Sequence, residues 1–570
     1  RDYIGYSKGT DKDLVSVRHF FLGKDSKRSH GKVRENVLSK RVGFSGRAVI
    51  IPAANINMPP FFVGIPWYIA LRIYDKLLEL KLMRVLDKIA DEMQRVHGFN
   101  DTDSILSISS QQLSDLLLSL WEFNYTILNN IIHANRNTCM AFYNILRRYV
   151  KMFIEGDANY DGTVTVDGKH IAPKDLDDDA NINASVVILG RQPTLHKRSE
   201  RALFVTLVDG WCIHIHQAIC KSYNADFDGD SEYVVAVFGE AKVEALKKMH
   251  VTQDLISDKD GEFALDLVQD TCLGLYCMTS YKNNIDHIRK EDSKIYFYDD
   301  YRTLQTDLEY GTLHYYDVII YKNKDSNNYY LSTAGRILVN AMLPNAFTDM
   351  PFRDKKGIAV EMGIDTDGIN FCELKFDDVW ASTKPAEGRT NILISSILNY
   401  IYETVDERET VLVCQKLYEL GLIASDLYGV SMSLEDLSVS TDISGIMAKP
   451  KEKSDESNLL YQFGLINPEE KDIVAKNAWR DAQKDAQKEI LKDLAYDSNT
   501  YYMLYSGARG KPAQLMQSVG FVGTIKKTET EDIQTPILNG YGNGLTSFDL
   551  YQTTFSARMG VVSTQAETKN

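Results

Sequence analysis

The stretch Tyr223–Tyr233, YNADFDGDSEY, carries three aspartates on alternate residues around one glycine. In an extended strand Asp226, Asp228 and Asp230 would share one face, but the outer two would lie roughly 13 Å apart at about 3.3 Å per residue. That separation is too large for one ion. Gly229 permits backbone angles that curl the segment until all three carboxylates converge. Converging carboxylates repel one another unless one is protonated or a cation binds, so the stretch predicts a cation site on a loop.

A hard divalent cation with oxygen ligands suits this arrangement, and Mg²⁺ binds one or two carboxylates while leaving positions for phosphates. A solvated acidic turn is the alternative, since short acidic runs are commonly exposed loops. A calcium-binding EF-hand loop is excluded. With Asp226 at position 1, the glycine position holds Ser231 and the glutamate position holds Val237.

Length and composition describe a multidomain globular protein. The 570 residues exceed what one hydrophobic core usually supports, and 44% hydrophobic with 25% charged residues is ordinary for a folded chain. No run of about eighteen apolar residues and no signal peptide is recognisable, so no membrane association is expected. The seven cysteines include no CxxC pair, which predicts free thiols in a reducing compartment and no zinc site.

A basic segment interrupts an acidic chain. The formal net charge of -15 argues against a general nucleic-acid coat, because phosphate binders are usually positive. Residues 24–47 invert this balance, since only Asp25 and Glu35 oppose the basic side chains there. A phosphate-binding track and a solvated face both fit this composition. The basic residues are Lys24, Lys27, Arg28, Lys32, Arg34, Lys40, Arg41 and Arg47.

Hydrophobic periodicity predicts both helices and strands. Between about 184 and 240, short β-rich runs separated by turns predict a compact barrel or sandwich. Asp167-Gly168 is expected to form a hairpin turn, and a charged helix is expected to begin at Asn467 and Pro468. A final helix is expected from about 544 onward. Apolar residues at helical spacing predict core packing for Leu71, Leu78, Leu82, Leu86, Ile89 and Met93.

NADFDGD resembles the metal-binding signature of the largest (β′) subunit of multisubunit RNA polymerases. GRQPTLHKRS (190–199) resembles the family segment that precedes this signature, and GKVRENVLSKRVGFSGRAVI (31–50) is similar to the basic switch segment beside the template strand. Ordered matches along nearly the whole chain identify it as β′-like. The remaining matches are QDTCLGLYCMT (269–279), TAGRILVNAMLP (333–344), GVSMSLEDL (429–437), SGARGKPAQLMQ from Ser506 and GLTSFDLYQTTFSARMG from Gly544.

The resemblance implies an α+β fold in which a double-psi β-barrel forms the catalytic core. Mainly helical modules would flank this core, and a bridge helix would follow at the C-terminal end. The implied divisions are a switch or template-contacting segment (1–60), a helical module (61–155), the barrel with its metal loop (156–265), a mixed α/β funnel region (266–500), the SGARG loop region (501–542) and the bridge helix (543–570).

The implied activity is that of a DNA-directed RNA polymerase, a nucleotidyltransferase active only with partner subunits. Asp226, Asp228 and Asp230 would be catalytic and would hold one Mg²⁺, and a second Mg²⁺ would arrive with the triphosphate. Arg191 and Asn224 would contact the ribose hydroxyls of the incoming nucleotide. The family also implies nucleotide contact by Thr564 on the bridge helix and nucleic-acid contact by Lys32, Arg34, Lys40, Arg41, Arg47 and Arg558.

Both ends of the chain depart from the family pattern. The clamp with its zinc-binding cysteines does not precede the switch segment, and the chain stops at Asn570 before a trigger loop. A split β′ subunit, similar to those of large bacteriophages, would explain both ends, as would a cropped chain. The implied partners are β-like subunits, a separate C-terminal β′ portion carrying the trigger loop, a promoter-specificity factor, template DNA, product RNA and nucleoside triphosphates. The expected location is the cytoplasm of a bacterial host or a virion.

Two other functions stay open. A single-chain polymerase of the RNA-silencing type also uses a DxDGD-like loop on a double-psi barrel, although the SGARG and bridge segments favour the multisubunit kind. A non-catalytic nucleic-acid-binding paralogue would be expected to lose an aspartate, and all three are present.

Overall fold

A computed structural model shows two compact units, Arg1–Asp254 and Leu255–Asn570. The structure describes residues 42–53, 57–257, 261–267, 269–280, 295–324, 328–344, 347–351, 371–375, 389–433, 435–437, 442–494, 498–527, 533 and 535–567.

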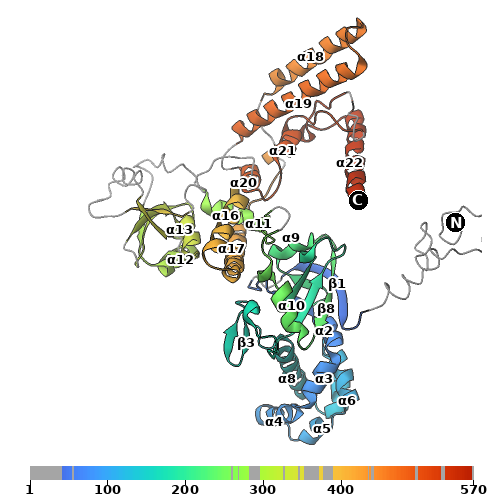
Figure 1. The fold of residues 1–570 in the computed structure, drawn as a ribbon, viewed down its shortest axis with the longest axis vertical. Coiled ribbons are helices and arrows are strands. Elements are labelled where there is room, and N and C mark those ends of the chain that lie inside the picture. Colours follow the sequence, from blue (N-terminus) through green and yellow to red (C-terminus); the bar gives the residue numbers. More distant parts are fainter. Residues whose placement is uncertain are drawn as a thin grey trace, which may run out of the picture. The chain divides into compact units, whose positions relative to one another are not determined.

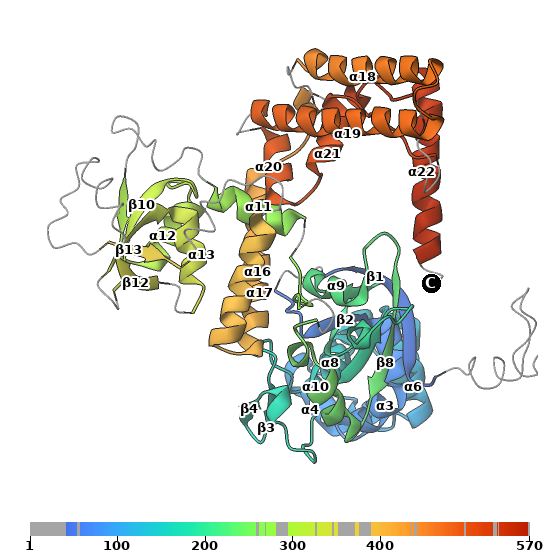
Figure 2. The ribbon, with the colours of Figure 1, turned by 45° about the horizontal axis from the view of Figure 1, so that its top comes forward.

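A closed six-stranded β-barrel forms the centre of the first unit (Figure 2). The order around the barrel is β1-β7-β2-β6-β5-β8. The pairs β1–β7 and β2–β6 are parallel, and the other neighbours are antiparallel. This closed, mixed order is compatible with the predicted double-psi barrel. The strands are β1 (Ser45–Pro52), β2 (Phe62–Pro66), β5 (Val186–Gly190), β6 (Glu200–Val208), β7 (Ile213–Ile215) and β8 (Ser231–Val237).

Aliphatic and aromatic residues of several strands fill the barrel core. Strand β6 is mostly buried, as is usual for a strand covered on both faces, and it contributes Leu203 and Phe204. Strand β8 alternates instead, with Val234 and Ala236 buried. Strands β1 and β2 lie upstream of residue 156, so the barrel draws on all three of the N-terminal divisions expected from the sequence.

Helices α2 to α8 form a module between β2 and β3 (Figure 1). The six apolar residues predicted to pack in a core are all buried, and they lie on three successive helices. Arg147 on α8 lies over the ring of Trp67 on α2, 4.3 Å from its centroid, which joins the two helices. The helices are α2 (Trp67–Ile73), α3 (Asp75–Met83), α4 (Leu86–His97), α5 (Thr102–Leu106), α6 (Ser110–Leu118), α7 (Tyr125–Ile132) and α8 (Arg136–Glu155).

The predicted hairpin follows α8. Strands β3 (Val164–Val166) and β4 (Lys169–Ile171) pair antiparallel. The turn residues Asp167 and Gly168 have φ of 50° and 76°, the positive angles that a tight hairpin turn requires. The shorter elements of this unit are η3 (Pro173–Asp175), η4 (Lys197–Ser199), η5 (Gln217–Ile219), α9 (Cys220–Tyr223), α10 (Ala241–Met249) and η6 (Val251–Gln253).

The second unit contains a small α/β core and a set of helices. Strands β11-β10-β9 form one sheet, and β12 pairs with β13. Buried residues such as Leu304, Ile319, Tyr330 and Ile337 join the sheets to two helices. These elements are β9 (Tyr296–Tyr298), α12 (Tyr301–Glu309), β10 (Val318–Lys322), β11 (Tyr329–Thr333), α13 (Ala334–Ala341), β12 (Phe347–Pro351) and β13 (Cys372–Leu374).

Two long helices, α18 and α19, lie side by side in this unit (Figures 1 and 2). Helix α19 begins as predicted, because Asn467 and Glu470 form a capping box around Pro468. The predicted final helix is also present as α22. The helices are α11 (Asp270–Thr279), α16 (Arg389–Thr404), α17 (Glu407–Tyr428), α18 (Ser444–Gln462), α19 (Pro468–Asp493), α20 (Asn499–Ser506), α21 (Pro512–Val519) and α22 (Ser547–Glu567), with η8 (Glu435–Leu437) and η9 (Tyr541–Asn543).

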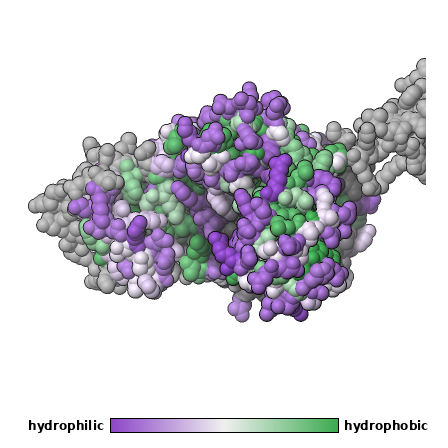
Figure 3. Space-filling model, turned by 90° about the horizontal axis from the view of Figure 1, so that it is seen from below, coloured by the Kyte–Doolittle hydropathy of each residue, from purple (hydrophilic) through white to green (hydrophobic). Residues whose placement is uncertain are grey.

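Hydrophilic residues cover much of the face seen in Figure 3, with smaller hydrophobic patches between them. Among the described residues, none of the helices combines the length and apolarity needed to cross a bilayer. The seven cysteines all lie in the described part of the chain; none of them forms a disulfide, and five are buried.

Candidate metal centre

The metal loop joins a short helix to a barrel strand. Helix α9 ends at Asn224, whose backbone is left-handed with φ of 48°. The chain then turns and enters β8 at Ser231. Gly229 has φ of 120°, a conformation that residues with a Cβ rarely adopt. The backbone NH of Ile50 donates to the carbonyl of Asp230 at 2.9 Å, so the end of the loop is tied to β1.

The loop brings three carboxylates together. One oxygen each of Asp226, Asp228 and Asp230 lies within 4.8 Å of the others. Asp226 and Asp228 are exposed, and Asp230 is partly buried. Three carboxylate oxygens with an open side match the donor set that a hard divalent cation such as Mg²⁺ prefers. The predicted convergence is therefore confirmed, and ion binding stays a prediction.

Arg191 pairs with one of these carboxylates. Its Nε lies 2.8 Å from Oδ2 of Asp230, and its Nη2 donates to Oδ1 at 3.1 Å. The backbone NH of Asp226 also donates to Oδ2 of Asp230 at 3.1 Å. The side chains of Arg191 and Asp230 each keep 20% of their surface exposed. This is the two-point guanidinium–carboxylate geometry, which is among the stronger side-chain contacts in proteins.

The carboxylates have different proton affinities. A hydrogen bond with Asp226 and then the charge of Asp226 raise the pKa of Asp228. Burial acts to raise the pKa of Asp230, but the hydrogen bonds from Arg191 and from the Asp226 backbone outweigh it and hold that pKa below its ordinary value. Asp230 is therefore the carboxylate whose charge the protein itself stabilises.

A fourth carboxyl group lies inside the barrel, two residues beyond Asp230. Glu232 is fully buried, and neither of its oxygens has a hydrogen-bond partner among the described residues. Burial raises its pKa to about 8, the charge of Arg191 opposes that rise, and Asp230 adds to it. Sequence reasoning did not identify Glu232, although its alternation with Val234 and Ala236 indicates the inward face of a strand.

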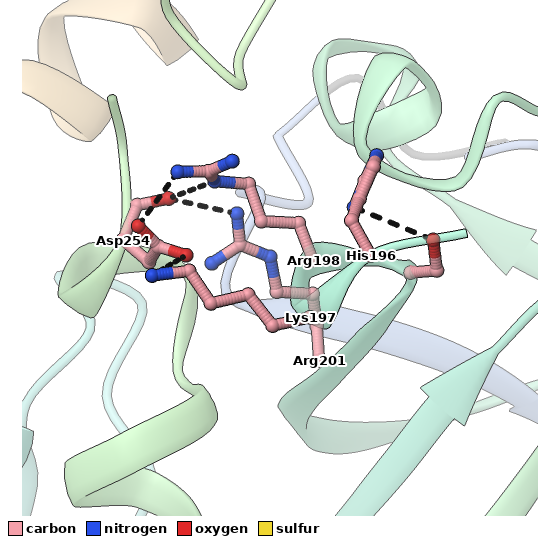
Figure 4. Close-up of polar contacts among 6 residues, drawn as sticks. His196, Lys197, Arg198, Arg201 and Asp254 are labelled. Carbon is pink, nitrogen blue, oxygen red and sulfur yellow. Dashed lines mark hydrogen bonds and ion pairs between the residues drawn. The ribbon is translucent and has the colours of Figure 1, made fainter. Parts of the chain in front are cut away.

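The segment that carries Arg191 leads into an ionic cluster around Asp254, in which Lys197 is largely exposed (Figure 4). Oδ1 of Asp254 accepts a hydrogen bond from Nη2 of Arg198 at 2.9 Å, and its Oδ2 lies 3.2 Å from Nζ of Lys197. Arg201 donates to the backbone carbonyl of Asp254 at 2.9 Å. Arg198 and Arg201 are both buried. These contacts join the start of β6 to the residue that follows η6, and sequence reasoning did not identify Asp254.

The other predicted site residues lie in three places. Asn224 stands at the end of α9, two residues before Asp226. Arg47 lies on β1, and its Nε donates to Oγ of Ser231 at 2.9 Å, next to the metal loop. Arg558 and Thr564 belong to α22 in the second unit, where Arg558 is exposed. The roles of these residues stay predictions. Outside the described residues lie Lys32, Arg34, Lys40 and Arg41.

One protein family matches a part of the chain that includes four of the six barrel strands. The family described as RNA polymerase Rpb1, domain 2, matches residues 148–251. This range contains strands β3 to β8, Arg191 and the three aspartates.

Proteins named DNA-directed RNA polymerase subunit beta′ are similar to almost the whole chain. The one from Ehrlichia chaffeensis is 24% identical over 589 residues, which cover 100% of this chain and 34% of that protein. The relative from Natranaerobius thermophilus is 24% identical, with 98% and 40% covered. The relative from Lysinibacillus sphaericus is 23% identical, with 98% and 42% covered. The chain therefore spans less than half the length of these relatives.

Proposed function

We propose that this chain, which is β′-like over almost its whole length, forms the catalytic part of a DNA-directed RNA polymerase and adds nucleotides to the 3′ end of RNA. The observation that carries the proposal is the convergence of Asp226, Asp228 and Asp230 on a barrel loop, inside the segment that matches the polymerase family. Because the relatives are longer, the activity is proposed for an assembly that also contains the counterparts of their remaining length.

Asp226, Asp228 and Asp230 would hold Mg²⁺. When bound, this ion polarises the RNA 3′-hydroxyl, and a second Mg²⁺ carried by the triphosphate stabilises the leaving pyrophosphate. The protein needs no nucleophile of its own for this reaction, because its contribution is to position charges and substrates. Asp226 and Asp228 suit this purpose, since their exposure lets substrate oxygens approach the same ion.

Arg191 and Asn224 are proposed to contact the sugar of the incoming nucleotide. A guanidinium donates hydrogen bonds, and an amide both donates and accepts them, so together they can recognise a pair of ribose hydroxyls. Their positions support this assignment. Arg191 contacts Asp230 directly, and Asn224 lies two residues before Asp226.

Contacts to the nucleic acid are proposed for the basic residues near β1 and for α22. Arg47 supports the first part, because its side chain lies beside the metal loop. Helix α22 would be the bridge helix, with Arg558 proposed to contact the nucleic acid and Thr564 the nucleotide. Phosphate contacts of this kind position a strand without reading its sequence.

The assembly is proposed to contain β-like subunits, the remaining β′ portion with its trigger loop and a promoter-specificity factor. Template DNA, RNA and nucleoside triphosphates would be its substrates and products. The bacteriophage origin, the split β′ subunit and the location in a bacterial cell or virion are predictions from the sequence resemblance.

The test is RNA extension on a primed template by the assembled enzyme with Asp228→Asn. We expect extension to fall by about a thousandfold, because the loss of metal-based charge stabilisation is worth several kcal/mol. Assembly and template binding should stay unchanged. Asp179→Asn removes the same charge from an exposed position away from the loop and should extend RNA normally.

Near-normal extension by the Asp228→Asn assembly would show that the metal assignment is wrong. Normal assembly and template binding without any extension by the wild-type protein would instead favour the non-catalytic paralogue.

A further inference from the structure

Asp230 has a cationic partner within the protein itself. Its Oδ1 accepts a hydrogen bond from Nη2 of Arg191, and its Oδ2 forms an ion pair with Nε of Arg191. Oδ2 also accepts a hydrogen bond from the backbone NH of Asp226. Within the described part of the chain, no comparable ion pair reaches Asp226 or Asp228, and Asp228 instead shares a hydrogen bond with Asp226. The charge of the triad is thus compensated at one carboxylate.

The backbone of Arg191 is anchored, and its side chain has an open side. Its backbone is fixed, since the NH of Arg191 donates to the carbonyl of Ser199 at 3.4 Å. The next residues run into the cluster around Asp254 (Figure 4). The side chain keeps 20% of its surface exposed, so the guanidinium has an open side toward which it can move away from Asp230.

We propose that Arg191 is the counter-ion of the metal-free triad and that it releases Asp230 when a divalent cation binds. In the metal-free state the guanidinium supplies part of the positive charge that the three carboxylates require. Cation binding then makes the same side chain available to the sugar hydroxyls of a nucleotide. The second half of this inference rests on the proposed function, whereas the first half concerns the metal site alone.

Electrostatics predicts the direction in which cation affinity changes when the charge of Arg191 is removed. A positive charge beside Asp230 repels an incoming cation and competes with it for the same carboxylate oxygens. Removing that charge should therefore strengthen cation binding. A residue that merely orients Asp230 would have the opposite effect, because its loss would let the carboxylate turn away and weaken binding.

Two substitutions separate these roles. Arg191→Gln removes the charge, whereas Arg191→Lys keeps it and loses only the planar two-point contact. If Arg191 is a counter-ion, the Arg191→Gln protein should bind the cation more tightly and the Arg191→Lys protein should bind it nearly as the wild type does. If Arg191 only orients Asp230, both variants should bind the cation more weakly.

The experiment is a Mn²⁺ titration of the full chain, with free Mn²⁺ measured by electron paramagnetic resonance and Mg²⁺ added as competitor. We expect Arg191→Gln to bind Mn²⁺ about tenfold more tightly and Arg191→Lys to stay within about twofold of the wild type. Arg95→Gln is the matched control. Arg95 is exposed in the last turn of α4, and its loss should change nothing.

A second measurement needs no destabilising variant. In wild-type protein with ¹⁵N-labelled arginine, the hydrogen-bonded Nε–H of Arg191 should give a protected signal, assigned by its absence in Arg191→Lys. Saturating Mg²⁺ should abolish that protection. Retention of the protected signal at saturating Mg²⁺, or unchanged or weaker Mn²⁺ binding by folded Arg191→Gln, would overturn the counter-ion role.

Titration of Asp228→Asn with Mn²⁺ distinguishes failure of the proposed function from failure of the counter-ion inference. If this variant binds Mn²⁺ as well as the wild type, the triad is not the metal site and the proposed function loses its support. If it loses Mn²⁺ while Arg191→Gln shows no tightening, the metal site stands and only the counter-ion inference falls.

Discussion

At the scale of single residues, Gly229 sets the curvature of the metal loop. Its φ of 120° is rarely adopted by other residues, and a Cβ added there would meet no atom within 4 Å. The requirement for glycine is therefore one of backbone conformation and not of space. The three carboxylates converge because this residue lets the chain turn between Asp228 and Asp230.

Gly229→Ala should disturb the loop without creating a clash. We expect a stability loss of about 1–3 kcal/mol from backbone strain. If the loop relaxes to avoid that strain, Mn²⁺ binding should weaken by about tenfold, which corresponds to about 1.4 kcal/mol. Urea unfolding and the Mn²⁺ titration measure the two effects.

Gly210→Ala is the matched control for this prediction. Gly210 lies between β6 and β7 and has φ of 98°, and a Cβ added there would also meet no atom within 4 Å. This variant should lose stability but keep its Mn²⁺ affinity. Equal Mn²⁺ binding by both alanine variants would contradict the importance of Gly229 for the triad.

At the scale of elements, two glycines allow helices α11 and α17 to cross closely in the second unit. A Cβ on Gly274 would lie 1.8 Å from the carbonyl oxygen of Gly421, and one on Gly421 would lie 2.6 Å from that of Thr271. Neither glycine has a positive φ. Here the reason for glycine is the opposite of that at Gly229, because space is limiting and the backbone is ordinary helix.

Gly274→Ala should push the two helices apart. We expect a loss of about 1–3 kcal/mol in the free energy of unfolding, the usual cost of overpacking. Hydrogen exchange at the amides of α11 and α17 would report the change locally. Gly445→Ala is the control, since a Cβ in α18 meets nothing within 4 Å and should be neutral or stabilising by up to about 1 kcal/mol. Normal protection of α11 in Gly274→Ala would refute the close-packing argument.

At the scale of the whole molecule, the net charge and the length of the relatives both bear on the proposed polymerase activity. The chain carries a net charge of -15, so the proposed nucleic-acid contacts would have to come from local basic surfaces. It also spans between 34% and 42% of the three relatives described above. The proposed active site would work by enclosing its substrate with well-placed charges, and the proposal assigns part of that enclosure to the counterparts of the relatives' remaining length.

The isolated chain should therefore fail to extend a primed template, even with Mg²⁺ and all nucleotides. Extension should appear only after a β-like subunit and the remaining β′ portion are added. The measurement is a primer-extension assay in which these components are added one at a time. Robust extension by the chain alone would favour the single-chain polymerase.

Features that depend on neighbouring residues could be predicted from the sequence. The turn at Asp167-Gly168 and the start of α19 at Asn467 follow from local backbone angles and hydrogen bonds over a few positions. Convergence of the aspartates follows in the same way from their spacing around Gly229. The buried positions from Leu71 to Met93 were predictable because helical spacing repeats within one segment.

The meeting of distant groups depends on tertiary packing. The contact of Arg191 with Asp230 spans 39 residues, and that of Arg198 with Asp254 spans 56. Strand β1 closes the barrel against β8, far along the chain, and this pairing helps to bury Glu232. Local propensity carries no information about such partners, because strand order and side-chain burial are selected by packing of the whole core. The ligands of the proposed metal site can thus be recognised in the amino-acid sequence alone. The contact of Arg191 with Asp230, which balances part of their charge, depends instead on closure of the barrel.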